Sequence, residues 1–266
     1  MTELINERVR YDVDGAVARI TLARPDAGNG LDLAMAQAIQ AAAKKVQRAA
    51  GDGGVRAVLL AAEGRMFCVG GDLREIAGAS DPGKHIADIA AATHDALRRF
   101  ANAPVPVVSA VGGAAAGGGI GVALAGDIVL VADNVSFTLA YTAAALSPDC
   151  GTSWQLARRL GAARTLDLAL TNRLLSAADA AAWGLVSRVV SADSLTTEAD
   201  KVLLTLGSGP SEAYAETKRL VLAALDSDLV TQLDDEAATI SALVAKPDGK
   251  EGMDAFLNKR KPVFAR

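Results

Sequence analysis

The chain has 266 residues, of which 51% are hydrophobic and 22% charged, a balance typical of a globular protein. The net charge of −4 gives no electrostatic reason to expect nucleic acid as a partner. No apolar run reaches the ~18 residues of a membrane span, and the charged start MTELINERVRYDV lacks the apolar core of a signal peptide. We therefore expect a cytoplasmic protein that binds neither nucleic acid nor membrane, built as one large domain or a domain with an appendage.

The N-terminal half predicts strands that alternate with helices. Asp14-Gly15 lies between strand-like runs at 8–13 and 16–22, the pattern of a hairpin. An amphipathic helix is expected over 31–50, with Asp32 near its start, and a buried strand over 55–61. Residues 74–90 contain glycines and a proline without clear periodicity, so we expect a flexible loop there, followed by a helix over 91–101.

The C-terminal half begins with more strands and ends in helices. The segment Pro104-Val105-Pro106 ends the preceding helix and leads into a strand at 107–111. Further strands are expected at 128–132 and 135–138, and helices dominate from about Trp154 onward. This order predicts an α/β core with a helical tail, which we divide into a core at 1–195 and a helical region at 196–266.

The two cysteines and two histidines lie far apart in the sequence and show no metal-ligand spacing. Cys68 and Cys150 are too few for a disulfide framework, and we expect both to be buried free thiols. The sequence therefore predicts no metal site.

Three consecutive glycines, Gly117, Gly118 and Gly119, separate a strand-like run from a helix-like run. A loop without Cβ atoms lets a ligand approach the backbone closely, and a helix start leaves its first N–H groups without partners. Such N–H groups can stabilise developing negative charge, as in an oxyanion hole. A tight strand-to-helix turn would contain the same glycines, so the triplet by itself leaves both interpretations open.

A second glycine turn follows the strand predicted at 55–61. Residues 66–73 read MFCVGGDL, so this strand too ends at glycines before a polar, helix-like stretch. Two turns at strand ends can place two N–H groups around one oxygen. Asp72 comes directly after the glycines, where we expect it to cap a helix rather than to catalyse.

Together with Asn29-Gly30-Leu31, these turns resemble the enoyl-CoA hydratase/isomerase (crotonase) superfamily. The resemblance extends over nearly the whole chain and follows the family order. Its blocks are RPDAGNGLD at 24–32, VRAVLLAAEGRMFCVGGDL at 55–73, PVVSAVGGAAAGGGIGVALAGDIVLVAD at 106–133, LTNRLLSAADAAAWGLVSRVV at 170–190 and EGMDAFLNKRKPVF at 251–264.

The resemblance implies a fold, a substrate class and an assembly. The fold would be a crotonase-like spiral of repeated ββα units with C-terminal helices that form a trimer, or a dimer of trimers. The substrate would be an acyl-CoA thioester, so that coenzyme A is part of the substrate and no separate cofactor is expected. The N–H groups of Gly71 and Gly118 match the family's oxyanion-hole motifs and would hold the thioester oxygen.

The two glutamates that family hydratases use are absent. The matching positions here are Gly121 and Tyr141. Glycine has no side chain and a phenol has an ordinary pKa of ~10, so neither can serve as a carboxylate base. The sequence therefore argues against an ordinary two-glutamate hydratase and leaves hydration by a non-standard base as an alternative.

Asp149 is the carboxylate that remains near the position of Tyr141. Family isomerases that act on phenylacetyl-CoA epoxides and on Δ3-enoyl-CoA carry an acid there as a single proton shuttle, whereas 4-chlorobenzoyl-CoA dehalogenases carry an aspartate nucleophile. We predict an isomerase in which Asp149 is the acid and base. A dehalogenase-like substitution and a non-catalytic acyl-CoA-binding protein are alternatives, and Asp149 also fits a helix N-cap.

His94 and Tyr141 bear on that choice. The dehalogenases place a histidine at the position of His94, but the resemblance implies that a histidine there is widespread in the superfamily, often as a helix residue packed beneath the site. They place a tryptophan at the position of Tyr141, so the tyrosine here puts halide binding in doubt, and we expect Tyr141 to line the acyl pocket. Glu63 and Glu75, near the first glycine turn, are reserve candidates for the catalytic acid.

Contacts to coenzyme A are also implied by the resemblance. The backbone of Val69 and Gly71 would contact the adenine, and Arg24 would approach the phosphates, although an exposed arginine at a strand end fits the sequence as well. Phe256 and Lys259 match residues that the tail or a neighbouring subunit lends to the coenzyme A. On sequence alone these two are the core face and the solvated face of an amphipathic helix.

Overall fold

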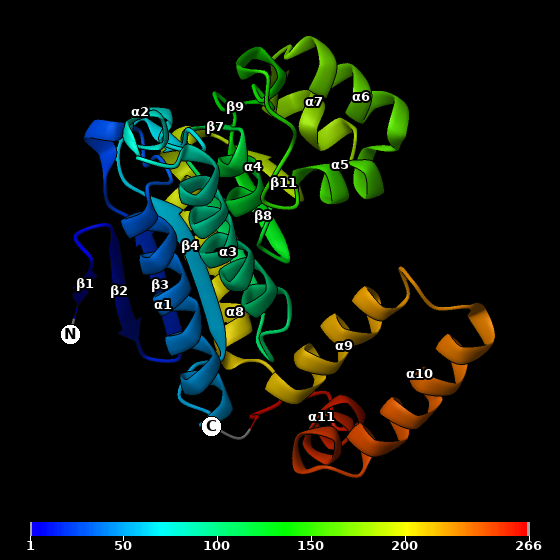
Figure 1. Cartoon of the computed structure of the whole chain (residues 1–266). Helices are drawn as coiled ribbons and strands as arrows, with labels where there is room; N and C mark the ends of the chain where they lie inside the picture. Colours follow the sequence, from blue (N-terminus) through cyan, green and yellow to red (C-terminus); the bar gives the residue numbers. More distant parts are fainter. Residues whose placement is uncertain (1, 265–266) are drawn as a thin grey trace.

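The computed structural model describes residues 2–264 of the chain (Figure 1). Strands and helices alternate as far as residue 190, and the chain is helical beyond it. The strands are β1 (Glu3–Ile5), β2 (Val9–Asp14), β3 (Val17–Leu22), β4 (Ala57–Ala62), β5 (Met66–Cys68), β6 (Val107–Val111), β7 (Ala114–Ala116), β8 (Ile128–Ala132), β9 (Ser136–Thr138), β10 (Leu175–Ser176) and β11 (Arg188–Val190). The α-helices are α1 (Leu33–Gly51), α2 (Leu73–Gly78), α3 (Pro82–Ala101), α4 (Gly118–Ala123), α5 (Thr152–Leu160), α6 (Ala162–Thr171), α7 (Ala177–Ala182), α8 (Leu195–Ser208), α9 (Ser211–Ala223), α10 (Leu229–Val244) and α11 (Pro247–Leu257).

The larger of two sheets has the strand order β1-β2-β3-β4-β6-β8-β11. The predicted hairpin is confirmed, because β2 and β3 pair antiparallel with Asp14 opposite Val17. From β3 onward every pairing in this sheet is parallel. The central strands are apolar on both faces, as expected of parallel strands that are covered on both sides.

A smaller sheet, with the order β10-β9-β7-β5, holds the second strand of each repeating unit. Each of β4, β6 and β8 lies in the large sheet and is followed by a short strand, β5, β7 or β9, in the small one. Helices follow these strand pairs, so the chain repeats a ββα unit. The predicted fold class is therefore confirmed: an α/β fold built from repeated ββα units, followed by C-terminal helices.

Helices α1 and α3 pack against each other and lie along one face of the large sheet (Figure 1). Helix α1 begins after Asp32, whose carboxylate accepts a 2.6 Å hydrogen bond from the N–H of Met35 as an N-cap. Its buried side recurs at helical spacing and includes Met35, Ile39 and Val46. This packing fixes the position of α3, which carries part of the candidate site.

The prediction of a flexible loop at 74–90 is wrong, because most of this segment is helical. Helix α2 ends at Gly78, and α3 begins at Pro82. Asp81 caps α3 by accepting a hydrogen bond from the N–H of Lys84, and Pro82 occupies the first helical turn, where its missing N–H costs nothing. The glycine and proline residues thus mark the boundary between two helices.

The C-terminal helices differ in their relation to the sheet. Helix α8 packs against β4, β6 and β8, whereas α9, α10 and α11 extend away from the core as a separate group (Figure 1). Nothing in the fold tests the proposed division at residue 195, which stays a prediction. None of the helices between residues 2 and 264 combines the length and the apolar character that crossing a membrane requires.

Candidate active site

The two glycine turns meet at one end of the small sheet. Strands β5 and β7 are parallel neighbours, so the turns that follow them, at 69–71 and 117–119, lie side by side. A Cβ atom on Gly70 would lie 2.8 Å from the carbonyl oxygen of Ala116 and 3.1 Å from the nitrogen of Gly118. Gly70 also has φ +86°, which favours glycine. Glycine is therefore needed here for the two turns to touch.

The backbone N–H groups of Gly71 and Gly118 are both without an acceptor in the described part of the chain. Leu31 donates to the carbonyl of Gly70 (2.8 Å) and accepts from the N–H of Asp72 (3.1 Å), a parallel bridge that leaves the N–H of Gly71 directed away from Leu31. Gly118 is the first residue of α4 and so has no acceptor within its helix. Among residues 2–264, neither N–H donates to a protein acceptor.

Both glycines line a cavity of about 430 Å³, which we call the central cavity. Asp149 is the one charged residue among the described residues that line it. The remaining lining is mostly apolar and comes from α2, α3, the loops that follow β5, β7 and β9, and Leu31 before α1. It consists of Leu31, Val69, Gly70, Leu73, Ile76, Ile86, Ala87, Ile89, Ala90, Gly117, Leu139, Ala140, Tyr141, Ala144, Leu146, Ser147, Pro148 and Cys150.

The backbone of Asp149 is held in place by three donors. Its carbonyl accepts hydrogen bonds from the Tyr141 hydroxyl (3.0 Å), the Thr152 hydroxyl (2.8 Å) and the Thr152 N–H (3.1 Å). Helix α5 begins after Gly151, and no side chain caps it, so the interpretation of Asp149 as an N-cap is wrong. With its main chain anchored in this way, the carboxylate is directed toward the central cavity and α3.

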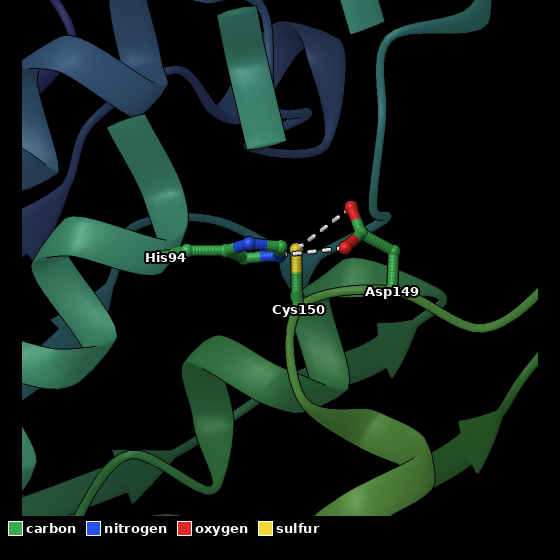
Figure 2. A group of neighbouring side chains, drawn as sticks. All are labelled: His94, Asp149 and Cys150. Carbon is green, nitrogen blue, oxygen red and sulfur yellow. Dashed lines mark hydrogen bonds and ion pairs between the residues drawn. The ribbon is translucent and has the colours of Figure 1, made fainter. Parts of the chain in front are cut away.

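His94 and Cys150 contact the carboxylate of Asp149 (Figure 2). The imidazole Nε2 of His94, on α3, lies 2.6 Å from Oδ1, and the Cys150 thiol donates to Oδ2 at 3.6 Å. The side chains of Asp149 and His94 are 36% and 38% exposed, whereas Cys150 is buried. Burial, reinforced by the negative charge of Asp149, raises the pKa of the Cys150 thiol.

Both cysteines are free and buried, as predicted. Burial raises the pKa of Cys68 to about 12. The absence of a metal site stays a prediction, although possible metal ligands do come together in the fold. The fold brings ligand atoms of His94, Asp149 and Cys150 within 4.8 Å of one another, from positions well separated in the sequence.

Gly121 has no room for a side chain. A Cβ atom at this position would overlap the carbonyl oxygen of Cys150 and lie 2.9 Å from the Cβ of Cys150. A glutamate there would have to displace the loop that carries Asp149. The other glutamate position of family hydratases, Tyr141, lines the central cavity, and burial raises the pKa of its hydroxyl, which keeps the phenol protonated.

Asp72 caps α2, as predicted, by accepting from the N–H groups of Arg74 (3.2 Å) and Glu75 (3.3 Å). Arg24 is already engaged, since its Nη1 lies 2.9 Å from carboxylate oxygens of both Asp72 and Asp32. Burial alone would raise the pKa of Asp72, but Arg24 and the two N–H donors hold it below its ordinary value. The suggested contact of Arg24 with phosphates stays a prediction.

Of the other predicted site residues, some line the central cavity and some lie away from it. Val69 lines the cavity, and its N–H donates to the carbonyl of Gly28 (3.1 Å), which leaves only its carbonyl for a ligand. Phe256, in α11, is 83% exposed, and neither it nor Lys259 lines the cavity within one chain. The reserve acids Glu63 and Glu75 do not line it either, and they bind Arg10 and His85 respectively.

Sequence reasoning did not name the individual side chains of the cavity wall that α2 and α3 form. Leu73 and Ile76 come from α2, and Ile86 and Ala90 from α3. The pair Asp81-Pro82, an N-cap followed by a proline in the first turn, was the available signal for the start of α3. Cys150 was also missed as a site residue, and its position directly after Asp149 was the only local hint.

Comparison with known proteins places this arrangement in a family. The sequence profile described as "Enoyl-CoA hydratase/isomerase" matches residues 12–266. The chain belongs to the enoyl-CoA hydratase/isomerase family. The family acts on acyl-CoA thioesters, so this chain has the architecture of an acyl-CoA enzyme.

Individual family members carry names of both reaction types. The chain is 37% identical to a Rhodobacter capsulatus protein named "Probable enoyl-CoA hydratase" over 96% of this chain and 97% of that protein. It is 36% identical to the 1,2-epoxyphenylacetyl-CoA isomerase of Escherichia coli, over 97% and 98% of the two chains. A solved enoyl-CoA hydratase from Polaromonas superposes with a TM-score of 0.90 at 32% identity, covering 97% of this chain and 99% of its own. Overall similarity therefore does not distinguish hydration from isomerisation.

Proposed function

We propose that this family member is an enoyl-CoA isomerase in which Asp149 removes a proton from one carbon of the acyl chain and returns it to another. The observation that carries the proposal is that Asp149 is the one charged residue among the described residues that line the central cavity. A single carboxylate is sufficient for such a transfer, because the same group acts first as base and then as acid.

In this proposal the thioester carbonyl oxygen lies between the N–H groups of Gly71 and Gly118. Loss of a proton next to the thioester places negative charge on that oxygen, and two fixed donors stabilise this enolate more than the neutral substrate. The apolar wall of the cavity strengthens the effect, because it excludes water that would screen the charge. Tyr141 lines the acyl pocket in this arrangement.

Hydration by two carboxylates is disfavoured by the same geometry. That reaction needs one group to activate water and a correctly placed acid to deliver a proton. Gly121 has no space for a side chain, and Tyr141 has a protonated phenol. A hydratase built on this chain would therefore need a base other than the usual pair.

A dehalogenase-like substitution is the second candidate, and the contact between His94 and Asp149 favours it. An aspartate that attacks the halogen-bearing aromatic carbon forms an ester as the halide leaves, and a neighbouring imidazole could activate the water that hydrolyses that ester. The Tyr141 hydroxyl donates to the backbone of Asp149, however, so it is not free to hold a leaving halide without giving up that bond.

The variant Asp149→Asn tests the proposal, with Glu75→Gln as a control that removes the nearby reserve acid. We expect Asp149→Asn to lower isomerisation of enoyl-CoA thioesters by ~10²–10⁴ while the affinity for a saturated acyl-CoA stays nearly unchanged. Loss of α- or γ-deuterium from labelled enoyl-CoA follows the proton directly. Full activity of Asp149→Asn would refute the role of this carboxylate. Halide release from 4-chlorobenzoyl-CoA would support the second candidate. Tight binding of acyl-CoA without turnover of any substrate would indicate a non-catalytic binding protein.

The proposal includes a homotrimer or a dimer of trimers as the working assembly. Helices α9 to α11 expose large apolar side chains, among them Leu229, Ile240, Phe256 and Leu257, each at least 70% exposed in one chain. Apolar faces of this kind are typical of protein contacts. In such an assembly Phe256 and Lys259 would reach the coenzyme A of a neighbour. Light scattering on the purified protein measures the number of chains.

A further inference from the structure

The group formed by His94, Asp149 and Cys150 combines three kinds of donor around one small space (Figure 2). An imidazole nitrogen, a carboxylate oxygen and a thiol sulfur are the three protein donor types that bind Zn²⁺, whereas Mg²⁺ and Ca²⁺ prefer oxygen donors only. We propose that these three side chains form a binding site for a borderline-soft divalent cation, Zn²⁺ being the physiological candidate, and that the bound ion blocks Asp149.

One donor pair already has the spacing of a tetrahedral ion, and a second is close to it. Bond lengths of ~2.0–2.2 Å to nitrogen and oxygen and ~2.3 Å to sulfur place ligand atoms of one ion roughly 3.4–3.6 Å apart. The Cys150 sulfur lies 3.6 Å from Oδ2 of Asp149, which matches this separation. His94 Nε2 lies only 2.6 Å from Oδ1, so a rotation of the carboxylate or the imidazole would have to open this pair by less than an ångström.

The site can be reached from the central cavity. Asp149 and Cys150 both line the cavity, and the Asp149 and His94 side chains are more than one third exposed. Three protein ligands leave the fourth position of a tetrahedral ion open toward the cavity for water. A thiolate and a carboxylate would neutralise the two positive charges of the ion, and the thiol proton would leave to solvent.

A second group of possible ligands in the described chain differs because its carboxylate oxygens are already bound to other side chains. Asp32, Asp72 and Glu75 also place carboxylate oxygens within 4.8 Å of one another. Arg24 contacts both aspartates, Arg8 binds Asp32, and His85 binds Glu75, so arginine and histidine side chains already occupy these oxygens. Those carboxylates would have to give up these partners in order to bind a metal ion. His94, Asp149 and Cys150, by contrast, contact one another with no arginine or lysine among them.

Binding is tested first without any substrate, so that the result does not depend on the proposed isomerase activity. Tag-free protein is required, because the chain has only two histidines and an added histidine tag would dominate binding. Protein freed of metal with a chelator is titrated with Co²⁺, which reports tetrahedral thiolate binding by a charge-transfer band, and Zn²⁺ is then added to displace it. We expect one ion per chain and full displacement by Zn²⁺.

The variant Cys150→Ser should remove the charge-transfer band and weaken Zn²⁺ binding by at least about tenfold. The matched control is Cys68→Ala, because Cys68 is the other buried thiol and does not belong to this group. X-ray absorption at the zinc edge of the unmodified protein, expected to show one sulfur with nitrogen and oxygen ligands, keeps the test valid if a variant does not fold. The absence of stoichiometric binding, or a band that persists in Cys150→Ser, would overturn the proposal.

The second part of the proposal, that the ion blocks Asp149, rests on the proposed function. Zn²⁺ should abolish turnover of an enoyl-CoA at the concentration at which one ion binds, and a chelator should restore it. Binding without inhibition would leave the site in place but overturn the blocking role. Inactivity of the metal-free protein would count against the proposed function instead, which separates the two failures.

Discussion

The imidazole Nε2 of His94 lies 2.6 Å from Oδ1 of Asp149, although 54 residues separate the two in the sequence. The contact joins α3, which lies on the large sheet, to the loop before α5. A hydrogen bond of this kind restricts the rotation of the carboxylate and so determines which carbon of a bound acyl chain the carboxylate can reach. We infer that His94 is a positioning residue for Asp149.

Replacement of His94 tests this positioning role. We expect His94→Ala to lower kcat for isomerisation by about tenfold to a hundredfold, the equivalent of the ~1.5–3 kcal/mol of a hydrogen bond to a charged group. His94→Gln should recover most of this loss, because the amide keeps an N–H donor. The affinity for a saturated acyl-CoA serves as the control and should change little. A glutamine variant as slow as the alanine variant would mean that the imidazole itself moves protons.

Gly118 offers a matched pair of variants for the proposed oxyanion hole. Both Gly118→Ala and Gly118→Pro add a Cβ atom that would lie 2.9 Å from the Cys150 sulfur, but only proline removes the N–H. We expect the proline variant to turn over enoyl-CoA at least ~10²–10³ times more slowly than the alanine variant. Equal rates in two folded variants would remove Gly118 from the mechanism.

Substitution of Gly121 should destabilise the protein as well as the site. The new Cβ atom in Gly121→Ala would overlap the carbonyl of Cys150, so the loop that carries Asp149 has to move, and overpacking of this kind costs about 1–3 kcal/mol. Urea denaturation measures the loss. Gly51→Ala is the control, because no atom lies within 4 Å of its Cβ position, and it should be neutral or stabilising by up to ~1 kcal/mol. A fully stable Gly121→Ala protein with wild-type activity would contradict this account.

Asp72 should make stability depend on pH in the acid range. Its folded pKa lies below the ordinary value of 3.8, so the unfolded chain binds the proton more tightly. The stabilisation by the ionised carboxylate is therefore present above this value and is lost as the pH falls through the lower, folded pKa. Urea denaturation gives the free energy of unfolding of the wild type and of Asp72→Asn. The wild type should be the more stable at about pH 7, and this difference should shrink toward about pH 3, because asparagine keeps the helix cap without the charge. A gap that stays constant with pH would assign the effect to something other than ionisation.

Much of the fold could be predicted because its signals are local. The apolar runs at 55–61, 107–111 and 128–132 became β4, β6 and β8, since short apolar segments between turn residues form buried strands. The segment at 74–90 was misjudged because the same glycines and proline that can belong to a loop can also separate two helices. Its short helix α2 has no long periodic pattern from which it could be recognised.

The candidate site could be predicted only in part, because its chemistry depends on contacts between distant segments. The glycine turns follow predictable strands, so their approach could be expected from the sequence. The contact of His94 with Asp149 and the collision at Gly121 depend on how α3 and the loop at 147–151 pack, which no local pattern encodes. Sequence resemblance indicated the position of Asp149, and the fold decided between a helix cap and a cavity carboxylate.

The two candidate donors for the thioester belong to the main chain at the ends of paired strands, whereas the carboxylate is a single side chain on a separate loop. Point mutations can therefore replace the reactive side chain without disturbing the backbone N–H groups that would bind the thioester. A scaffold divided in this way can acquire a new reaction through changes at a few positions near 149 while it keeps its ligand. Redesign of this chain should accordingly begin at that loop and leave both glycine turns intact.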